Sequence, residues 1–227
     1  SESPTLEIIL HAGTLGSILV VFWRRILRLL GQDQRVIPLL VVGTIPAATV
    51  GVIIKLAFPH LIRSPLLAGT MLLVTGAMLI VLGRLRPREQ TYPTLSWSGA
   101  FLVGCFQAFA ILPGISRSGS TILGGRLMGL KDDDSVTFSF LLAIPAILGA
   151  TVLTLRDLWQ QQQEGLTLDH GPTALAAGAA VSFVVGIVSL WWLIGWSRQD
   201  RLHWFAWWCL PVGVLTILHF GFGFPGL

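Results

Sequence analysis

Charge is scarce in this chain of 227 residues, and cysteine is scarcer still. Asp, Glu, Lys and Arg make up 11% of the residues, whereas about a quarter of a typical soluble domain is charged. Hydrophobic residues make up 53% of the chain, and the mean hydropathy is +0.76. This composition excludes a disordered chain and an ordinary soluble enzyme. The two cysteines, Cys105 and Cys209, both lie in apolar stretches, which excludes a disulfide scaffold. We therefore expect an integral membrane protein.

Six apolar runs are long enough to cross a bilayer, because a helical span needs about 20 mostly apolar residues. They cover residues 6–23, 36–58, 66–83, 135–155, 172–196 and 204–224. A further apolar region, 95–130, is interrupted by proline, glycine and hydroxyl residues. The predicted fold is an all-α integral membrane protein with about six transmembrane helices, forming one polytopic domain over residues 1–227.

The arginines predict the orientation of these spans. Alternate loops divide them nine to two: loops 24–35, 84–94 and 197–203 hold nine, and loops 59–65 and 156–171 hold two. The arginine-rich loops are therefore expected to be cytoplasmic. Region 95–130 must then begin and end on the same side. Irregular backbone is tolerated at membrane depth only where it lines a protein cavity, so this region is predicted to be a re-entrant helix–loop–helix.

The turn of this hairpin contains the residues that are candidates for binding or catalysis. Residues 113–121 read Pro-Gly-Ile-Ser-Arg-Ser-Gly-Ser-Thr, and the charged residues nearest to Arg117 are Glu89 and Arg126. An arginine at membrane depth without a local acid needs a distant counter-charge or a ligand. A guanidinium group surrounded by hydroxyls and free N–H groups suits a phosphate. In the alternative interpretation, the small residues pack helices and Arg117 extends to the membrane interface.

Other polar residues allow two interpretations each. Asp132, Asp133 and Asp134 resemble a metal cluster, but they directly precede the helix predicted from Ser135, so capping of that helix is favoured. Glu7 and His11 lie one helical turn apart on one face of the first span. They could project together into a cavity, or Glu7 could simply be solvated near the end of the span.

The same stretch resembles a known family. Gly-Cys-Phe-Gln at 104–107, followed by Leu-Pro-Gly-Ile-Ser-Arg-Ser-Gly-Ser-Thr at 112–121, is similar to the second signature of the bacterial undecaprenyl-diphosphate phosphatase family, the bacitracin-resistance type. The similarity runs through nearly the whole chain. Members hydrolyse the diphosphate of the C55 lipid carrier to its monophosphate, which recycles the carrier for cell-wall synthesis. The resemblance implies an inverted-repeat hydrolase of the bacterial inner membrane, with an active site open to the periplasmic side.

The resemblance also implies roles for individual residues. Arg117 would bind the diphosphate, and Ser116, Ser118 and Thr121 would donate hydrogen bonds to its oxygens. These four residues form the implied catalytic group. The expected substrate-binding residues are Gly114, Gly119, Ser120, Glu7 and His11. The implied cofactor is a divalent cation, Mg²⁺ or Ca²⁺. The implied partners are a polyprenyl diphosphate lipid and the membrane, with a homodimer as a possible assembly and no nucleic acid.

One part of the family pattern is not matched. The family has an earlier signature, with two glutamates four residues apart followed by a Pro-x-Ser-Ser-x-Gly-His element. We therefore expect an N-terminal re-entrant hairpin ahead of residue 1 to supply the metal ligands, and no metal ligands within residues 1–227. The alternative function is a transporter or lipid flippase, because inverted repeats and re-entrant hairpins are common in transporters.

Overall fold

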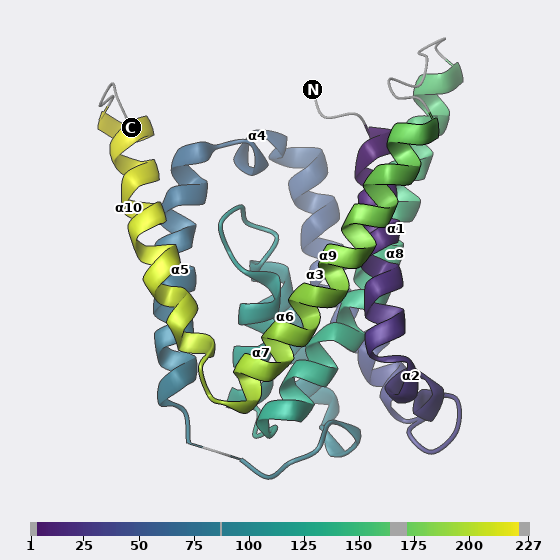
Figure 1. Cartoon of the computed structure of the whole chain (residues 1–227), viewed down its shortest axis with the longest axis vertical. Coiled ribbons are helices and arrows are strands. Elements are labelled where there is room, and N and C mark those ends of the chain that lie inside the picture. The colour runs from purple at the N-terminus through teal and green to yellow at the C-terminus, as the bar shows by residue number, and fades with distance from the viewer. Residues whose placement is uncertain (1–3, 87, 164–171, 223–227) are drawn as a thin grey trace.

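The computed structural model describes residues 4–86, 88–163 and 172–222. Six long helices run side by side through the molecule (Figure 1). They are α1 (Pro4–Val21), α3 (Val36–Ala57), α5 (Pro65–Arg84), α8 (Asp132–Gln163), α9 (Pro172–Arg198) and α10 (Ala206–Phe222). Short helices α2 (Trp23–Leu29) and α4 (Pro59–Ile62) and 3-10 helices η1 (Tyr92–Thr94) and η2 (Leu202–Phe205) lie between them. Helices α6 (Trp97–Phe109) and α7 (Arg117–Leu127) form a shorter hairpin inside this bundle.

The predicted spans are confirmed. Within the described residues, five helices are long and apolar enough to cross a membrane, and α1 with α2 makes a sixth candidate bent by 79°. The bend corrects the prediction that 24–35 is a loop, because Trp23–Leu29 is helical. Arginines 24, 25 and 28 are costly within hydrocarbon, which accounts for a helix that turns aside at the end of the span instead of continuing through it.

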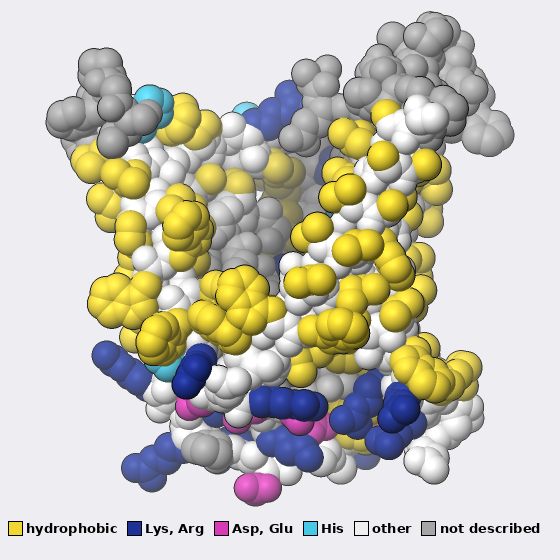
Figure 2. Space-filling view, viewed as in Figure 1, with side chains coloured by type: hydrophobic (Ala, Val, Ile, Leu, Met, Phe, Trp, Pro, Cys, Tyr) yellow, Lys and Arg dark blue, Asp and Glu magenta, His cyan; other side chains and the backbone are white. Residues whose placement is uncertain are grey.

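The arginine-rich connections lie together at one end of the bundle. Figure 1 places α2, the link from α5 to α6, and η2 at that end, and α4 at the other. Figure 2 shows most of the visible Lys and Arg side chains gathered below a broad hydrophobic band. On α10, Trp207 is 78% exposed and Trp208 is 72% exposed, as expected for side chains that face lipid or its interface. The division of arginines read from the sequence therefore corresponds to one end of the molecule.

The hairpin enters the bundle from the arginine-rich end. Helix α6 rises from that end, α7 returns to it, and the tip between them stops part-way along the bundle (Figure 1). This confirms a re-entrant helix–loop–helix within 95–130. Helices α1 and α8 run in opposite directions, as an inverted repeat requires, and the repeat itself remains a prediction.

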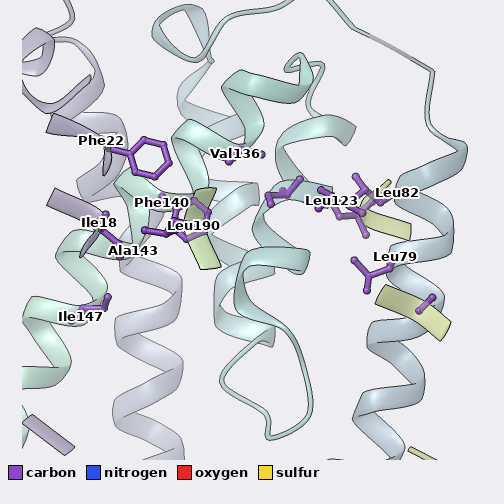
Figure 3. Packing of buried hydrophobic residues seen from close by; sticks show 13 residues of the cluster. Ile18, Phe22, Leu79, Leu82, Leu123, Val136, Phe140, Ala143, Ile147 and Leu190 are labelled. Carbon is purple, nitrogen blue, oxygen red and sulfur yellow. The ribbon is translucent and has the colours of Figure 1, made fainter. Parts of the chain in front are cut away.

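Two buried clusters hold the hairpin in place. In the first, Leu123 of α7 shares a core with Leu79 of α5, and with Ile18 and Phe140 of α1 and α8 (Figure 3). The second joins α6 to α3 and α8. A Cβ on Gly104 of α6 would lie 2.2 Å from a backbone oxygen of α3, so only glycine permits this approach.

The acidic run forms the first turn of α8, so this helix begins at Asp132 and not at Ser135 as predicted. Its three carboxylates meet three different cations: Asp132 pairs with Arg126, Asp133 with Arg198, and Asp134 with Lys131. Negative charge at a helix N-terminus is also stabilised by the helix dipole. These residues therefore anchor the base of the hairpin and the start of α8.

Candidate phosphate-binding site

The start of α7 forms the tip of the hairpin on its returning side. Ser116 is the N-cap, and its Oγ accepts a hydrogen bond of 3.2 Å from the backbone N–H of Gly119. This satisfies one of the backbone donors that a helix start leaves unpaired. The remaining donors carry the partial positive charge of the helix dipole. The local sequence thus ends the turn with a helix N-terminus directed into the bundle.

Arg117 is the first residue of α7 and is partly buried. In the part of the chain that the structure describes, its guanidinium group makes no ion pair and no hydrogen bond. The hydroxyl of Ser118, also partly buried, likewise has no hydrogen-bond partner among these residues. A cation and a hydroxyl donor without partners therefore stand next to each other at one helix start. An anion that accepts several hydrogen bonds would satisfy both.

Thr75 of α5 fixes the turn that leads into this helix. Its Oγ1 donates to the carbonyl of Gly114 at 2.8 Å and accepts from the backbone N–H of Ser116 at 3.1 Å. The side chain is only 3% exposed. One buried hydroxyl thus bridges two backbone groups on either side of Ile115. Sequence reasoning missed Thr75, although a threonine within an apolar span was a visible signal.

The backbone conformation at position 114 requires glycine. Its φ is +91°, in the region that favours glycine. A Cβ there would lie 2.1 Å from the carbonyl oxygen of Ala68 on α5. The structure therefore gives Gly114 a packing role against α5. Its predicted contact with substrate remains a prediction.

The hydroxyl residues further along α7 are enclosed. Thr121 is 1% exposed, and its Oγ1 lies 2.5 Å from Oγ of Ser139 on α8 and donates to the carbonyl of Arg117 at 2.9 Å. Ser120 is fully buried, and its Oγ has no hydrogen-bond partner among the described residues. The structure thus brings Thr121 into an α7–α8 contact, while Ser116, Arg117 and Ser118 lie partly buried at the start of the helix. Ser139 is a second residue that sequence reasoning did not single out.

The other predicted binding residues are more dispersed. Gly119 lies in the first turn of α7, where a Cβ would be 3.1 Å from Oγ of Ser116. His11 is partly buried on α1, which packs chiefly on α9 and α8, whereas the hairpin packs chiefly on α3, α5 and α8. A contact between His11 and the substrate therefore stays a prediction. The side chain of Glu7 lies outside what the structure describes.

The described residues do not supply a ligand set for a metal ion. No three His, Cys, Asp or Glu side chains among them lie close enough together to hold one. The divalent cation implied by the resemblance therefore finds no fitting site among the described residues.

Together, these features define a polytopic helical membrane protein whose re-entrant hairpin presents a candidate phosphate-binding site at the start of α7. The model of one family, described as bacitracin resistance protein BacA, matches residues 1–215. The chain belongs to this family.

Curated relatives agree with this assignment. An undecaprenyl-diphosphatase of Rhodopirellula baltica is 70% identical over 217 residues, covering 96% of this chain and 83% of the relative. One of Protochlamydia amoebophila is 38% identical over 220 residues, covering 94% of this chain and 82% of the relative. One of Desulfatibacillum aliphaticivorans is 35% identical over 243 residues, covering 96% and 86%. The similarity therefore extends over nearly all of the chain.

Proposed function

We propose that this protein hydrolyses undecaprenyl diphosphate to undecaprenyl phosphate and inorganic phosphate, recycling the lipid carrier of cell-wall synthesis. The observation that carries the proposal is the pair of unsatisfied donors, Arg117 and Ser118, at the start of α7. Family membership and the activity named for the relatives support the same reaction.

The chemistry of phosphoryl transfer explains why this arrangement is useful. The reaction concentrates charge on phosphate oxygens, so catalysis depends mainly on positioning and on charge stabilisation. A guanidinium group offers a planar fork of donors that binds two oxygens at once. In this proposal Arg117 holds the diphosphate, and Ser118 and the free N–H groups at the start of α7 donate to its oxygens.

The remaining residues have supporting roles in this proposal. Ser116 both caps α7 and offers its hydroxyl hydrogen to a phosphate oxygen, because accepting from Gly119 leaves that hydrogen available. Thr121 links α7 to α8 through Ser139 and so fixes the direction of the helix start. Gly114, Gly119, Ser120, Glu7 and His11 remain candidate substrate-binding residues.

The side of the membrane is part of the proposal. The tip of the hairpin is directed away from the arginine-rich end (Figure 1). The face drawn in Figure 2 is hollowed between α10 and α9, in front of that tip. If the arginine-rich end is cytoplasmic, the diphosphate reaches Arg117 from the periplasmic side of the inner membrane. A divalent cation, Mg²⁺ or Ca²⁺, and a homodimer also belong to the proposal.

Phosphate release from undecaprenyl diphosphate by the purified protein in detergent tests the reaction. We expect release with Mg²⁺ or Ca²⁺ and none after EDTA treatment. A transporter or flippase would instead move the lipid across proteoliposomes without releasing phosphate. Lipid movement with no phosphate release, in protein of unchanged thermal stability, would overturn the proposal.

A further inference from the structure

A cavity of about 500 Å³ lies at the arginine-rich end, away from the tip of the hairpin. It is formed where α1 ends and α2 begins, next to the start of α8 and the end of α9. Its charged lining comprises Arg24, Arg25, Arg28, Arg198 and Asp133. Neither the proposed hydrolysis nor the packing of the hairpin uses this cavity.

The bend between α1 and α2 brings the arginines together. Because α2 turns by 79° from α1, its arginines line the same cavity as Arg198 at the end of α9. Four arginines therefore converge from two helices that are far apart in sequence. The preference for arginine in cytoplasmic connections accounts for the arginines of α2. That preference does not require them to surround a cavity.

Acidic groups near this cavity are fewer than its arginines. Asp33 lies close to Arg25 through Tyr92, whose hydroxyl donates to Oδ2 of Asp33. Asp133 is the one acidic residue that lines the cavity, and its Oδ1 accepts a hydrogen bond of 3.1 Å from Nε of Arg198. The carboxylates on either side are directed elsewhere, since Asp132 pairs with Arg126 and Asp134 with Lys131. The three arginines of α2 form no ion pair among the described residues. The cavity therefore carries a clear excess of positive charge.

Apart from Thr137, the rest of the lining is apolar and lies at the level where a span ends. Val21, Phe22, Val136 and Ile194 contribute to the walls. Trp23, also in the lining, has the guanidinium carbon of Arg24 5.4 Å from its ring centroid, and tryptophan is enriched at membrane interfaces. An amphipathic ligand meets both requirements, an anionic group for the arginines and hydrocarbon for the apolar walls.

We propose that this cavity binds the phosphate headgroup of an anionic phospholipid from the leaflet at the arginine-rich end. Arginine recognises phosphate oxygens through paired hydrogen bonds, and basic pockets between transmembrane helices are suited to lipid headgroups. The arginines of α2 and Arg198 hold the phosphate, and the acyl chains leave along Phe22 and Ile194. A free phosphate ion offers the same anionic group without the hydrocarbon, and the experiment separates the two.

Titration of the purified protein with phosphatidylglycerol tests this proposal, with phosphatidylcholine as the zwitterionic reference. Bound lipid is counted by native mass spectrometry, and the thermal midpoint is followed in parallel. Phosphatidylglycerol should bind and raise the midpoint, and phosphatidylcholine should do neither. In the double variant Arg24→Gln and Arg28→Gln, the affinity for phosphatidylglycerol should fall about thirty-fold, given the usual contribution of each basic residue near an anionic surface.

A matched control removes the same charge from the same end. Arg84 and Arg88 are exposed and do not line the cavity, so Arg84→Gln with Arg88→Gln should leave the affinity within about threefold of the original. Arg198→Gln tests the cavity from α9 and should also weaken binding. Equal losses in the control pair would overturn the proposal in favour of general surface attraction. An equal midpoint shift from inorganic phosphate at the same concentration, or no preference for phosphatidylglycerol, would overturn it as well.

Discussion

The backbone N–H of Ser116 donates a 3.1 Å hydrogen bond to Oγ1 of Thr75. The same Oγ1 donates to the carbonyl of Gly114, so a single hydroxyl from α5 determines where α7 begins. Arg117 follows Ser116 directly. The position of the candidate phosphate-binding group is therefore set by a residue that need not touch the substrate.

Replacing Thr75 with valine should lower kcat about tenfold or more, with a smaller effect on KM. Valine keeps the shape but leaves the partly buried N–H of Ser116 without its partner, and small displacements of a positioning element are costly in catalysis. Thr75→Ser retains the hydroxyl and should restore most of the rate. Phosphate release at saturating and limiting lipid separates the two constants. Equal rates for the valine and serine variants would show that the hydrogen bonds do not position the site.

Gly114→Ala should destabilise the protein by more than about 1 kcal/mol, because the new Cβ meets a backbone oxygen and the φ is unfavourable for alanine. Gly149→Ala offers a matched control in α8, where a Cβ meets nothing within 4 Å. That substitution should be neutral or stabilising by about 0.5–1 kcal/mol. Thermal midpoints in detergent measure both changes. A Gly114→Ala midpoint no lower than that of Gly149→Ala would contradict the tight packing of the tip against α5.

The apolar runs and the loop arginines predicted the fold well, because both signals are local in sequence. The span predicted at 66–83 is α5 (Pro65–Arg84), and the one at 172–196 is α9 (Pro172–Arg198). Helix α2 was missed because a seven-residue helix at the membrane edge has no hydrophobic run of its own. Its direction depends on contacts with other helices.

The candidate site was predicted only in part, because sequence patterns indicate local features and not contacts between distant helices. The cluster around Arg117 is contiguous in sequence, and the structure places it at one helix start. Thr75 and Ser139 reach the hairpin from other helices, so their roles depend on tertiary packing.

The orientation of the molecule can be measured by cysteine labelling in intact cells. In a chain with Cys105→Ala and Cys209→Ala, Arg63→Cys should react with a membrane-impermeant maleimide added outside. Arg88→Cys should react only after the cells are permeabilised. Both positions are exposed, and the arginine count predicts that position 88 is cytoplasmic. The reverse pattern of labelling would invert the proposed topology and the access route to Arg117.

Arg117 is the proposed diphosphate-binding residue, and the contributions of its charge and of its planar shape can be tested separately. Arg117→Lys keeps the positive charge but loses the planar fork, so it should retain more activity than Arg117→Ala. Removing one strong donor from a phosphate site typically costs about 100-fold to 1000-fold in rate. Arg156→Ala, an exposed arginine at the far end of α8, serves as the control and should keep the original rate.

The most direct measurement is therefore the rate of phosphate release from undecaprenyl diphosphate by the purified protein and by Arg117→Ala at matched thermal stability. We predict phosphate release by the original protein and by Arg156→Ala, and a rate lower by about 100-fold or more in Arg117→Ala. Undiminished release by a folded Arg117→Ala variant would contradict this prediction.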